Sequence, residues 1–165
     1  MAAAALASAA STLMLLDLPT QIALQAAILL SADPRVPMRA KDLALYLGVS
    51  PPHMQRVLGQ MKKCGLVRSV RGPMGGVVLA RPPELITVWE VLVALEPVEA
   101  LEYCLLGLRR CNESNPCALH EAWGPLRARL LDELRNRTLR QAVTEAQRTS
   151  FAGFGREPLK LAPTR

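Results

Sequence analysis

Aromatic side chains are scarce in this sequence, which has only two each of Phe, Tyr and Trp in 165 residues. Half of the residues are nevertheless apolar, so the core must consist of Leu, Val, Ala and Met, which favours helices. No apolar run reaches the roughly eighteen residues of a membrane span. Residues 1–16 are rich in Ala and Leu but lack the basic segment and clear cleavage site of a signal peptide. We therefore expect a cytoplasmic protein with no membrane partner, built as one domain or as one domain with an extended dimerisation element.

Catalytic signatures are missing too. The chain has no glycine-rich phosphate-binding motif and no set of nucleophile and base, so we do not expect an enzyme.

Acids are almost absent from residues 39–81, which carry a net charge of +7 while the rest of the chain carries −1. This concentration predicts a surface that binds a polyanion, with an ordinary solvated face as the alternative. The segment holds one acid, Asp42, and eight basic residues: Arg39, Lys41, Arg56, Lys62, Lys63, Arg68, Arg71 and Arg81.

Three of the four cysteines lie together with a histidine, in the order Cys104, Cys111, Cys117 and His120. Thiolate and imidazole groups suit iron–sulfur clusters, zinc or copper, and the intervening residues are those of an irregular loop. Cytoplasmic cysteines stay reduced, so metal binding or redox sensing is favoured over a disulfide framework. Unconnected loop thiols beside a surface histidine remain the alternative. The fourth cysteine, Cys64, is expected to be an inert buried thiol.

The apolar pattern predicts three helices at residues 20–31, 39–47 and 51–63. Gly48-Val49-Ser50 separates the second helix from the third, with Ser50 as its expected N-cap. Two short β-branched runs at 66–70 and 76–80 flank a turn sequence, which predicts a β-hairpin. A helix at 86–95 follows. The sequence thus predicts a mainly α fold with a small β-hairpin wing, namely a winged helix-turn-helix plus a long dimerisation helix.

In the helix expected after the cysteine-rich loop, apolar residues recur at helical spacing and form one stripe. A stripe of this kind on a small domain needs a partner, and a second copy of the chain is the simplest one, so we expect a homodimer. Residues 136–138 are expected to interrupt the helix, with Thr138 capping a last segment that runs to about residue 147. The stripe consists of Leu119 and the predicted interface residues Trp123, Leu126, Leu130 and Leu134.

Two motifs resemble a known family. The string Leu66-Val-Arg-Ser-Val-Arg-Gly-Pro-Met-Gly-Gly76 resembles the wing of the IscR/NsrR/RirA/CymR (Rrf-two) family of bacterial transcription regulators, and Leu79-Ala-Arg-Pro-Pro83 continues it. The string Asn115-Pro-Cys-Ala-Leu-His-Glu-Ala-Trp123 is similar to the cluster-binding loop of its iron–sulfur members. The resemblance runs from about Met14 to Val143. It implies a homodimeric regulator that binds specific double-stranded DNA under the control of a cluster sensing nitric oxide, redox state or iron–sulfur status.

The resemblance also implies ligands. Cys104, Cys111 and Cys117 match the three ligand cysteines of a [2Fe-2S] or [4Fe-4S] cluster, and His120 matches the fourth ligand of the IscR-like branch. Six residues separate the first two cysteines where many members have five. Gln21 stands where other branches have a ligand acid, which favours His120. Zinc, a thiol–disulfide site or no cofactor are the alternatives.

DNA contacts are expected from the third helix and the wing. Lys62 and Lys63 are expected at phosphates, which position the protein, and Arg71 matches the minor-groove arginine of the family. Basic residues usual in the first helix of the family are absent, so a protein that interacts with other partners and has lost DNA binding is a further alternative. The residues expected to face base edges are Pro52, His53, Gln55 and Arg56, with mere solvation of the helix as the alternative for His53.

These expectations divide the chain into five parts. Residues 1–13 are expected to be an extension or the product of a mis-assigned start codon. Residues 14–96 form the DNA-binding domain and residues 97–120 the cysteine-rich loop. Residues 121–147 form the dimerisation region, and residues 148–165 are expected to be a disordered tail.

Overall fold

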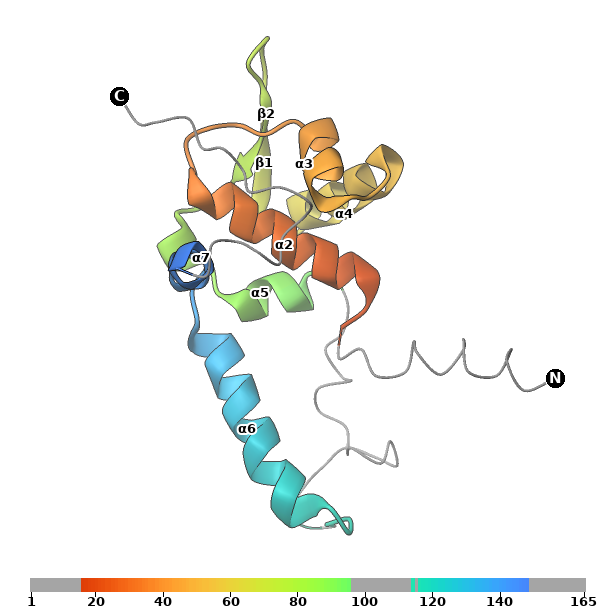
Figure 1. The fold of residues 1–165 in the computed structure, drawn as a ribbon, viewed down its shortest axis with the longest axis vertical. Helices are drawn as coiled ribbons and strands as arrows, with labels where there is room; N and C mark the ends of the chain where they lie inside the picture. The colour runs from red at the N-terminus through yellow and green to blue at the C-terminus, as the bar shows by residue number, and fades with distance from the viewer. Residues whose placement is uncertain (1–15, 96–113, 115, 149–165) are drawn as a thin grey trace, which may run out of the picture.

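The computed structural model describes residues 16–95, 114 and 116–148 (Figure 1). The predicted extension at 1–13, Cys104, Cys111 and most of the predicted tail lie outside these residues. None of the described helices has the combination of length and apolarity that crossing a membrane requires. The elements in chain order are α2 (Leu18–Ala32), α3 (Ala40–Leu47), α4 (Pro51–Lys63), β1 (Val67–Val70), β2 (Gly76–Leu79), a 3-10 turn η1 (Pro83–Leu85), α5 (Val88–Val93), α6 (His120–Asn136) and α7 (Leu139–Arg148).

Helix α2 is the centre of the core. The side chain of Asp17 caps its first turn by accepting a hydrogen bond from the backbone N–H of Thr20 at 2.9 Å. Helices α3, α4, α5 and α7 and strand β2 all contact α2, whose alanines allow close approach of their backbones. Ile22, Ala26, Leu29 and Leu30 of α2 are all buried.

Helices α3 and α4 form the predicted helix-turn-helix. Gly48 ends α3 in the left-handed region with a φ of 66°, a conformation that glycine adopts without strain. Ser50 is the N-cap of α4, as expected, but its side chain makes no capping hydrogen bond, and its carbonyl accepts from the N–H of Met54 at 3.0 Å. The apolar face of α4 is buried as the period predicted, through Met54, Val57, Leu58 and Met61.

Strands β1 and β2 form the predicted antiparallel hairpin, in which Val67 pairs with Leu79 and Val70 with Gly76. Met38, in the connection between α2 and α3, exchanges two backbone hydrogen bonds with Val77, at 3.0 and 2.8 Å. A Cβ on Gly76 would lie 2.5 Å from the carbonyl oxygen of Met38, so only glycine permits this approach. The hairpin is therefore fastened at its base to the chain that precedes α3.

Helix α5 is shorter than predicted. It starts at Val88, because Thr87 and Glu90 form a capping box in which each side chain accepts from the other residue's backbone N–H. Ile86 is extended instead of helical, and its carbonyl accepts from the N–H of Leu139 at 2.9 Å. The predicted helix start at residue 86 was therefore wrong by two residues.

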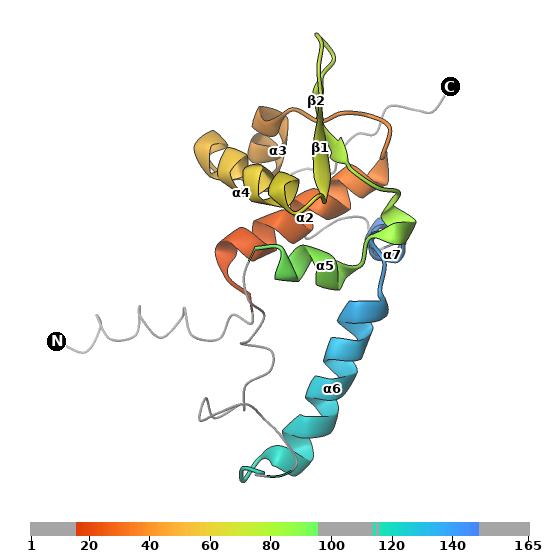
Figure 2. The same cartoon turned by 180° about the vertical axis from the view of Figure 1, so that it is seen from behind.

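Helix α6 projects away from the other elements, and α7 returns to pack on α2 (Figures 1 and 2). The predicted interruption is present, since α6 ends at Asn136 and α7 begins at Leu139. Thr138 caps α7 as predicted, accepting from the N–H of Gln141 at 3.2 Å. His120 is the first residue of α6, whereas the sequence assigned it to the end of the preceding loop.

Candidate nucleic-acid interface

The exposed face of α4 is polar at its N-terminal end. Pro52, Gln55 and Arg56 are exposed, and His53 is half-buried. The opposite face is held in the core by Met54 and by the other buried residues of α4. The buried apolar residues fix which face of α4 is turned toward the core. The predicted base-contacting residues therefore lie together on the outward face, with His53 at its edge.

The C-terminal half of α4 lies beside the hairpin. Lys62 is exposed, and its ammonium donates a hydrogen bond to the hydroxyl of Ser69 on β1 at 3.2 Å. Lys63 is exposed one residue further along. A shallow hollow of about 220 Å³ separates α4 from the hairpin and the start of α3. Two of its lining residues, Gln55 and Lys62, belong to the exposed face of α4, so the helix and the hairpin share one surface.

The hairpin carries positive charge without compensation by nearby acids. Arg68 and Arg71 are both exposed, and the sequence contains no Asp or Glu between Asp42 and Glu84. Arg39 adds a third arginine, whose guanidinium donates to the carbonyl oxygen of Pro73 in the hairpin turn at 3.3 Å. This contact joins residues 34 positions apart, and local sequence patterns carry no signal for it. The surface is thus basic over α4 and the hairpin together, as a polyanion requires.

The start of α6 holds the two candidate metal ligands that lie within the described residues. Cys117 is half-buried and not in a disulfide, and its carbonyl accepts from the N–H of His120 at 3.0 Å. The His120 ring lies over Gly124, where a built Cβ would be 3.5 Å from Cε1 and Nε2. Thiolate and imidazole one turn apart fit a soft or borderline metal centre. Within the described residues no group of three or more potential ligands gathers, since Cys104 and Cys111 lie outside them.

The predicted stripe on α6 is unevenly covered. Trp123, Leu130 and Leu134 are half-buried, and Leu126 is 64% exposed. The one buried residue of α6 is Leu131, which the stripe did not include and which lies on the helix that packs against α5. An apolar face that is this exposed within one chain has the character of an interface.

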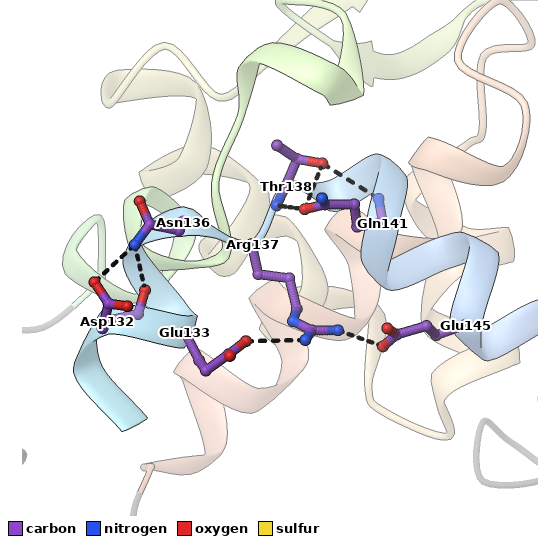
Figure 3. A network of polar contacts seen from close by, with 7 residues as sticks. All are labelled: Asp132, Glu133, Asn136, Arg137, Thr138, Gln141 and Glu145. Atoms are coloured by element: carbon purple, nitrogen blue, oxygen red, sulfur yellow. Dashed lines mark hydrogen bonds and ion pairs between the residues drawn. The ribbon is translucent and has the colours of Figure 1, made fainter. Parts of the chain in front are cut away.

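The junction between α6 and α7 ties α6 to the rest of the fold. Glu133 and Glu145 both pair with the guanidinium of Arg137, at 3.0 and 2.5 Å, and their hydrogen bonds raise its pKa (Figure 3). The carbonyl of Arg137 accepts a hydrogen bond from the N–H of Val88 at 2.8 Å, and Thr138 forms an isolated antiparallel β-bridge with Thr87. The junction therefore sets the direction of α6 relative to α5.

Two further contacts across this region were not predicted from the sequence. The guanidinium of Arg135 on α6 lies over the ring of Trp89 on α5, 4.8 Å from its centroid. Arg140 on α7 pairs with Glu84 at 2.7 Å, and this hydrogen bond is the main reason that the pKa of Glu84 is lowered. Both contacts join distant segments, so no local pattern would have found them.

Comparisons with known proteins agree with this geometry. The sequence model of the Rrf2 family, described as an iron-dependent transcriptional regulator, matches residues 16–145. The HTH-type transcriptional regulator IscR of Klebsiella pneumoniae is 31% identical over 117 residues, which are 71% of this chain and 71% of that protein.

Two solved structures are similar in fold. CymR, described as the global cysteine regulator of B. subtilis, has a TM-score of 0.66 and 23% identity, covering 79% of this chain and 96% of CymR. The IscR of T. potens has a TM-score of 0.63 and 23% identity, covering 94% and 96%. These similar proteins are regulators and not enzymes. The chain belongs to the Rrf2 family of DNA-binding, winged-helix transcriptional regulators.

Proposed function

We propose that this protein is a cytoplasmic, homodimeric regulator whose affinity for a specific DNA operator is controlled by an iron–sulfur cluster. The observation that carries the proposal is the shared basic surface of α4 and the hairpin, which contains no acid between Asp42 and Glu84. Sequence is read at base edges in the major groove, which admits one α-helix. Helix α4 is the exposed polar helix beside the hairpin and is therefore assigned to that groove.

The contacts divide by chemistry. Gln55 and Arg56 carry groups that make paired hydrogen bonds to adenine and guanine, respectively, while Pro52 and His53 lie beside them at the start of α4. Lys62 and Lys63 neutralise phosphates and set the register without reading bases. Arg71 at the hairpin turn enters the minor groove, where positive side chains are favoured by the negative potential.

The apolar face of α6 supplies the dimer. Leu126 is exposed in the single chain, and a second copy related by a two-fold axis would cover it. Trp123, Leu130 and Leu134 extend the same contact as half-buried neighbours. Two copies joined in this way place two α4 helices on a palindromic operator.

The proposed ligands of the cluster are Cys104, Cys111, Cys117 and His120. The donor set suits iron–sulfur chemistry, which gives the site a response to oxidants, nitric oxide and iron supply. Cys117 and His120 lie at the start of α6, and the other end of α6 is fastened to α5 by the Arg137–Thr138 junction. Because the junction holds α6 against α5, a change in ligation at the start of α6 rotates each protomer as a rigid body about the dimer contact and shifts the spacing of the two α4 helices.

A zinc or thiol–disulfide site in the same loop is the second candidate. Three cysteines and one histidine are also a recognised zinc set. The structural similarity to CymR adds no ligand chemistry, because at 23% identity it concerns the fold alone. A metal analysis distinguishes the two, since zinc brings no acid-labile sulfide.

The first test is the metal content of protein purified without oxygen. We expect iron and acid-labile sulfide in near-equal amounts, with visible absorption that is lost in Cys117→Ala. The matched control is Cys64→Ala, because Cys64 lies outside the loop. Its side chain is exposed, not buried as expected, and its thiol donates to the carbonyl of Ala94 at 3.4 Å. Colourless protein with stoichiometric zinc would mean that the loop holds a structural zinc ion and not an iron–sulfur cluster. If Cys64→Ala also loses its colour, the loss in Cys117→Ala no longer supports Cys117 as a cluster ligand.

A further inference from the structure

The turn of the β1–β2 hairpin carries an exposed methionine. Met74 is 83% exposed and Leu45 is 84% exposed, and these are the two most exposed large apolar side chains of the described residues. Met74 packs into no core, so the fold gains little from its apolar character. A long, adaptable thioether side chain that is held out from a surface is suited to contact with a partner.

The turn holds Met74 in a defined place. Gly75 donates its N–H to the carbonyl of Gly72 at 2.9 Å, and Gly72 has a φ of +115°. A Cβ on Gly75 would lie 2.3 Å from the carbonyl oxygen of Val70, so the turn is tight enough to require glycine there. On the other side, Arg39 donates to the carbonyl of Pro73 at 3.3 Å. The residues on both sides of Met74 are therefore fixed by contacts that do not involve its side chain.

The charged residues near Met74 on the hairpin indicate the chemistry of its partner. Arg68 and Arg71 are exposed on the same hairpin, and no acid lies within the whole segment from α4 to β2. Positive charge favours an anionic partner, whereas the exposed thioether needs an apolar surface on that partner. The minor groove of DNA offers both, with phosphates along its rim and sugars and base edges inside.

The position of the hairpin agrees with this groove. Its tip extends beyond α3 and α4, at the opposite end of the molecule from α6 (Figures 1 and 2). With α4 in the major groove, a hairpin beside it reaches the neighbouring minor groove. Apolar side chains that enter this groove pack against sugars and base edges, and the 2-amino group of guanine takes up the space they need.

We propose that Met74 is a specificity-determining residue, which enters the minor groove beside Arg71 and selects A·T over G·C base pairs there. The inference rests on the proposed DNA-binding function and deepens it. Arg71 supplies attraction to the groove, and Met74 supplies the discrimination between base pairs. Neither role depends on the metal content of the loop.

The test uses full-length protein and a duplex that the wild-type protein selects from a random pool. At the flanking positions where the hairpin lies, A·T pairs are replaced by G·C or by inosine·C, which has the minor-groove face of A·T and the major-groove face of G·C. For the wild type we expect inosine·C to bind within about twofold of A·T and G·C to bind about fivefold or more weakly. In Met74→Gln the penalty for G·C shrinks to about twofold, whereas Met74→Leu retains it.

The control variant is Leu85→Gln, which changes another exposed apolar residue, 62% exposed and located on η1, away from the hairpin tip. It should bind every duplex as the wild type does. An unchanged G·C penalty in Met74→Gln, or an inosine·C penalty equal to that of G·C, would overturn the role of Met74 while leaving DNA binding intact. A wild-type protein that selects no duplex would overturn the proposed function and this role together.

Discussion

The two ends of the molecule expose opposite kinds of surface. The end formed by α3, α4 and the hairpin buries most of its apolar residues within one chain, including Leu43, Met54 and Met61, and presents basic side chains to solvent. Its exposed large apolar residues, Leu45 and Met74, stand singly on different elements. Helix α6 buries only Leu131, exposes Leu126, and mixes acids with arginines along its length. The first end is complete as a single chain and is adapted to a polyanion. The second end leaves part of its apolar face exposed, and we propose that a second copy of the chain covers it.

The junction at Arg137 and Thr138 joins these two surfaces. It combines two ion pairs of Arg137, a capped start of α7 and a backbone bridge to Thr87, all within a short stretch (Figure 3). A connection of this kind transmits direction better than a flexible linker would.

The largest expected effect is on the dimer. Leu126→Glu places two like charges near the two-fold axis in an apolar contact, and we expect the dimer to dissociate about 100-fold more readily. Sedimentation equilibrium over a range of concentrations measures the change. Leu45→Glu is the control, because Leu45 is 84% exposed on α3, at the other end. An unchanged dimer constant for Leu126→Glu would place the interface elsewhere.

A smaller loss, of DNA affinity, is expected at the basic end of the molecule, which we propose faces the DNA. Arg71→Ala removes the charge at the hairpin turn and should weaken specific binding by about 1–3 kcal/mol without changing the oligomeric state. Fluorescence anisotropy with a selected duplex gives the dissociation constant. Arg129→Ala, exposed on α6, removes the same charge outside the proposed surface and serves as the control. Equal losses in both variants would reduce the role of Arg71 to general attraction.

A smaller effect, on the free energy of unfolding, is expected at the N-cap of α7. Thr138→Ala removes the hydroxyl that accepts from Gln141 and should lower the free energy of unfolding by about 0.5–2 kcal/mol. Urea unfolding followed by circular dichroism checks it. Thr144→Ala is the matched control, since Thr144 is exposed and its hydroxyl donates to the Arg140 carbonyl within α7 and not to the start of the helix. If both variants unfold alike, Thr138 does not act as a cap.

The smallest effect concerns the ion pair between Glu84 and Arg140. The hydrogen bond from Arg140 lowers the pKa of Glu84 below its ordinary value of 4.5, so the pair stabilises the fold above that value. This contribution is lost as the pH falls through the lowered pKa. Glu84→Gln should therefore be slightly less stable than the wild type at pH 7 and equally stable in strong acid. A difference that stays constant between these pH values would exclude the ion pair as its source.

Much of the DNA-facing end could be predicted from the sequence because its signals are local. Apolar spacing predicted the buried face of α4, and Gly48 and the Arg71–Gly76 turn marked the boundaries of elements that the structure contains. The exposure of Gln55 and Arg56 followed from the same spacing.

The errors arose where distant segments meet. Ile86 was assigned to a helix because it is apolar, but its carbonyl pairs with Leu139 and so holds it in extended backbone. Leu131 was left out of the stripe on α6 because its burial depends on packing of α6 against α5. The tie between Arg39 and Pro73 depends on two segments that only the fold brings together. Cys104 and Cys111 lie outside the described residues, so the proposed ligand set stays a prediction from spacing and resemblance.

We propose that ligation at the start of α6 controls DNA binding at the other end of the molecule. The most direct test is to titrate one selected duplex, without oxygen, with protein that holds its iron and sulfide and with the same protein after their removal. Both samples are first shown to be dimers. We expect the two dissociation constants to differ by about tenfold or more, since allosteric couplings commonly reach this size. Equal constants for the two samples would contradict it.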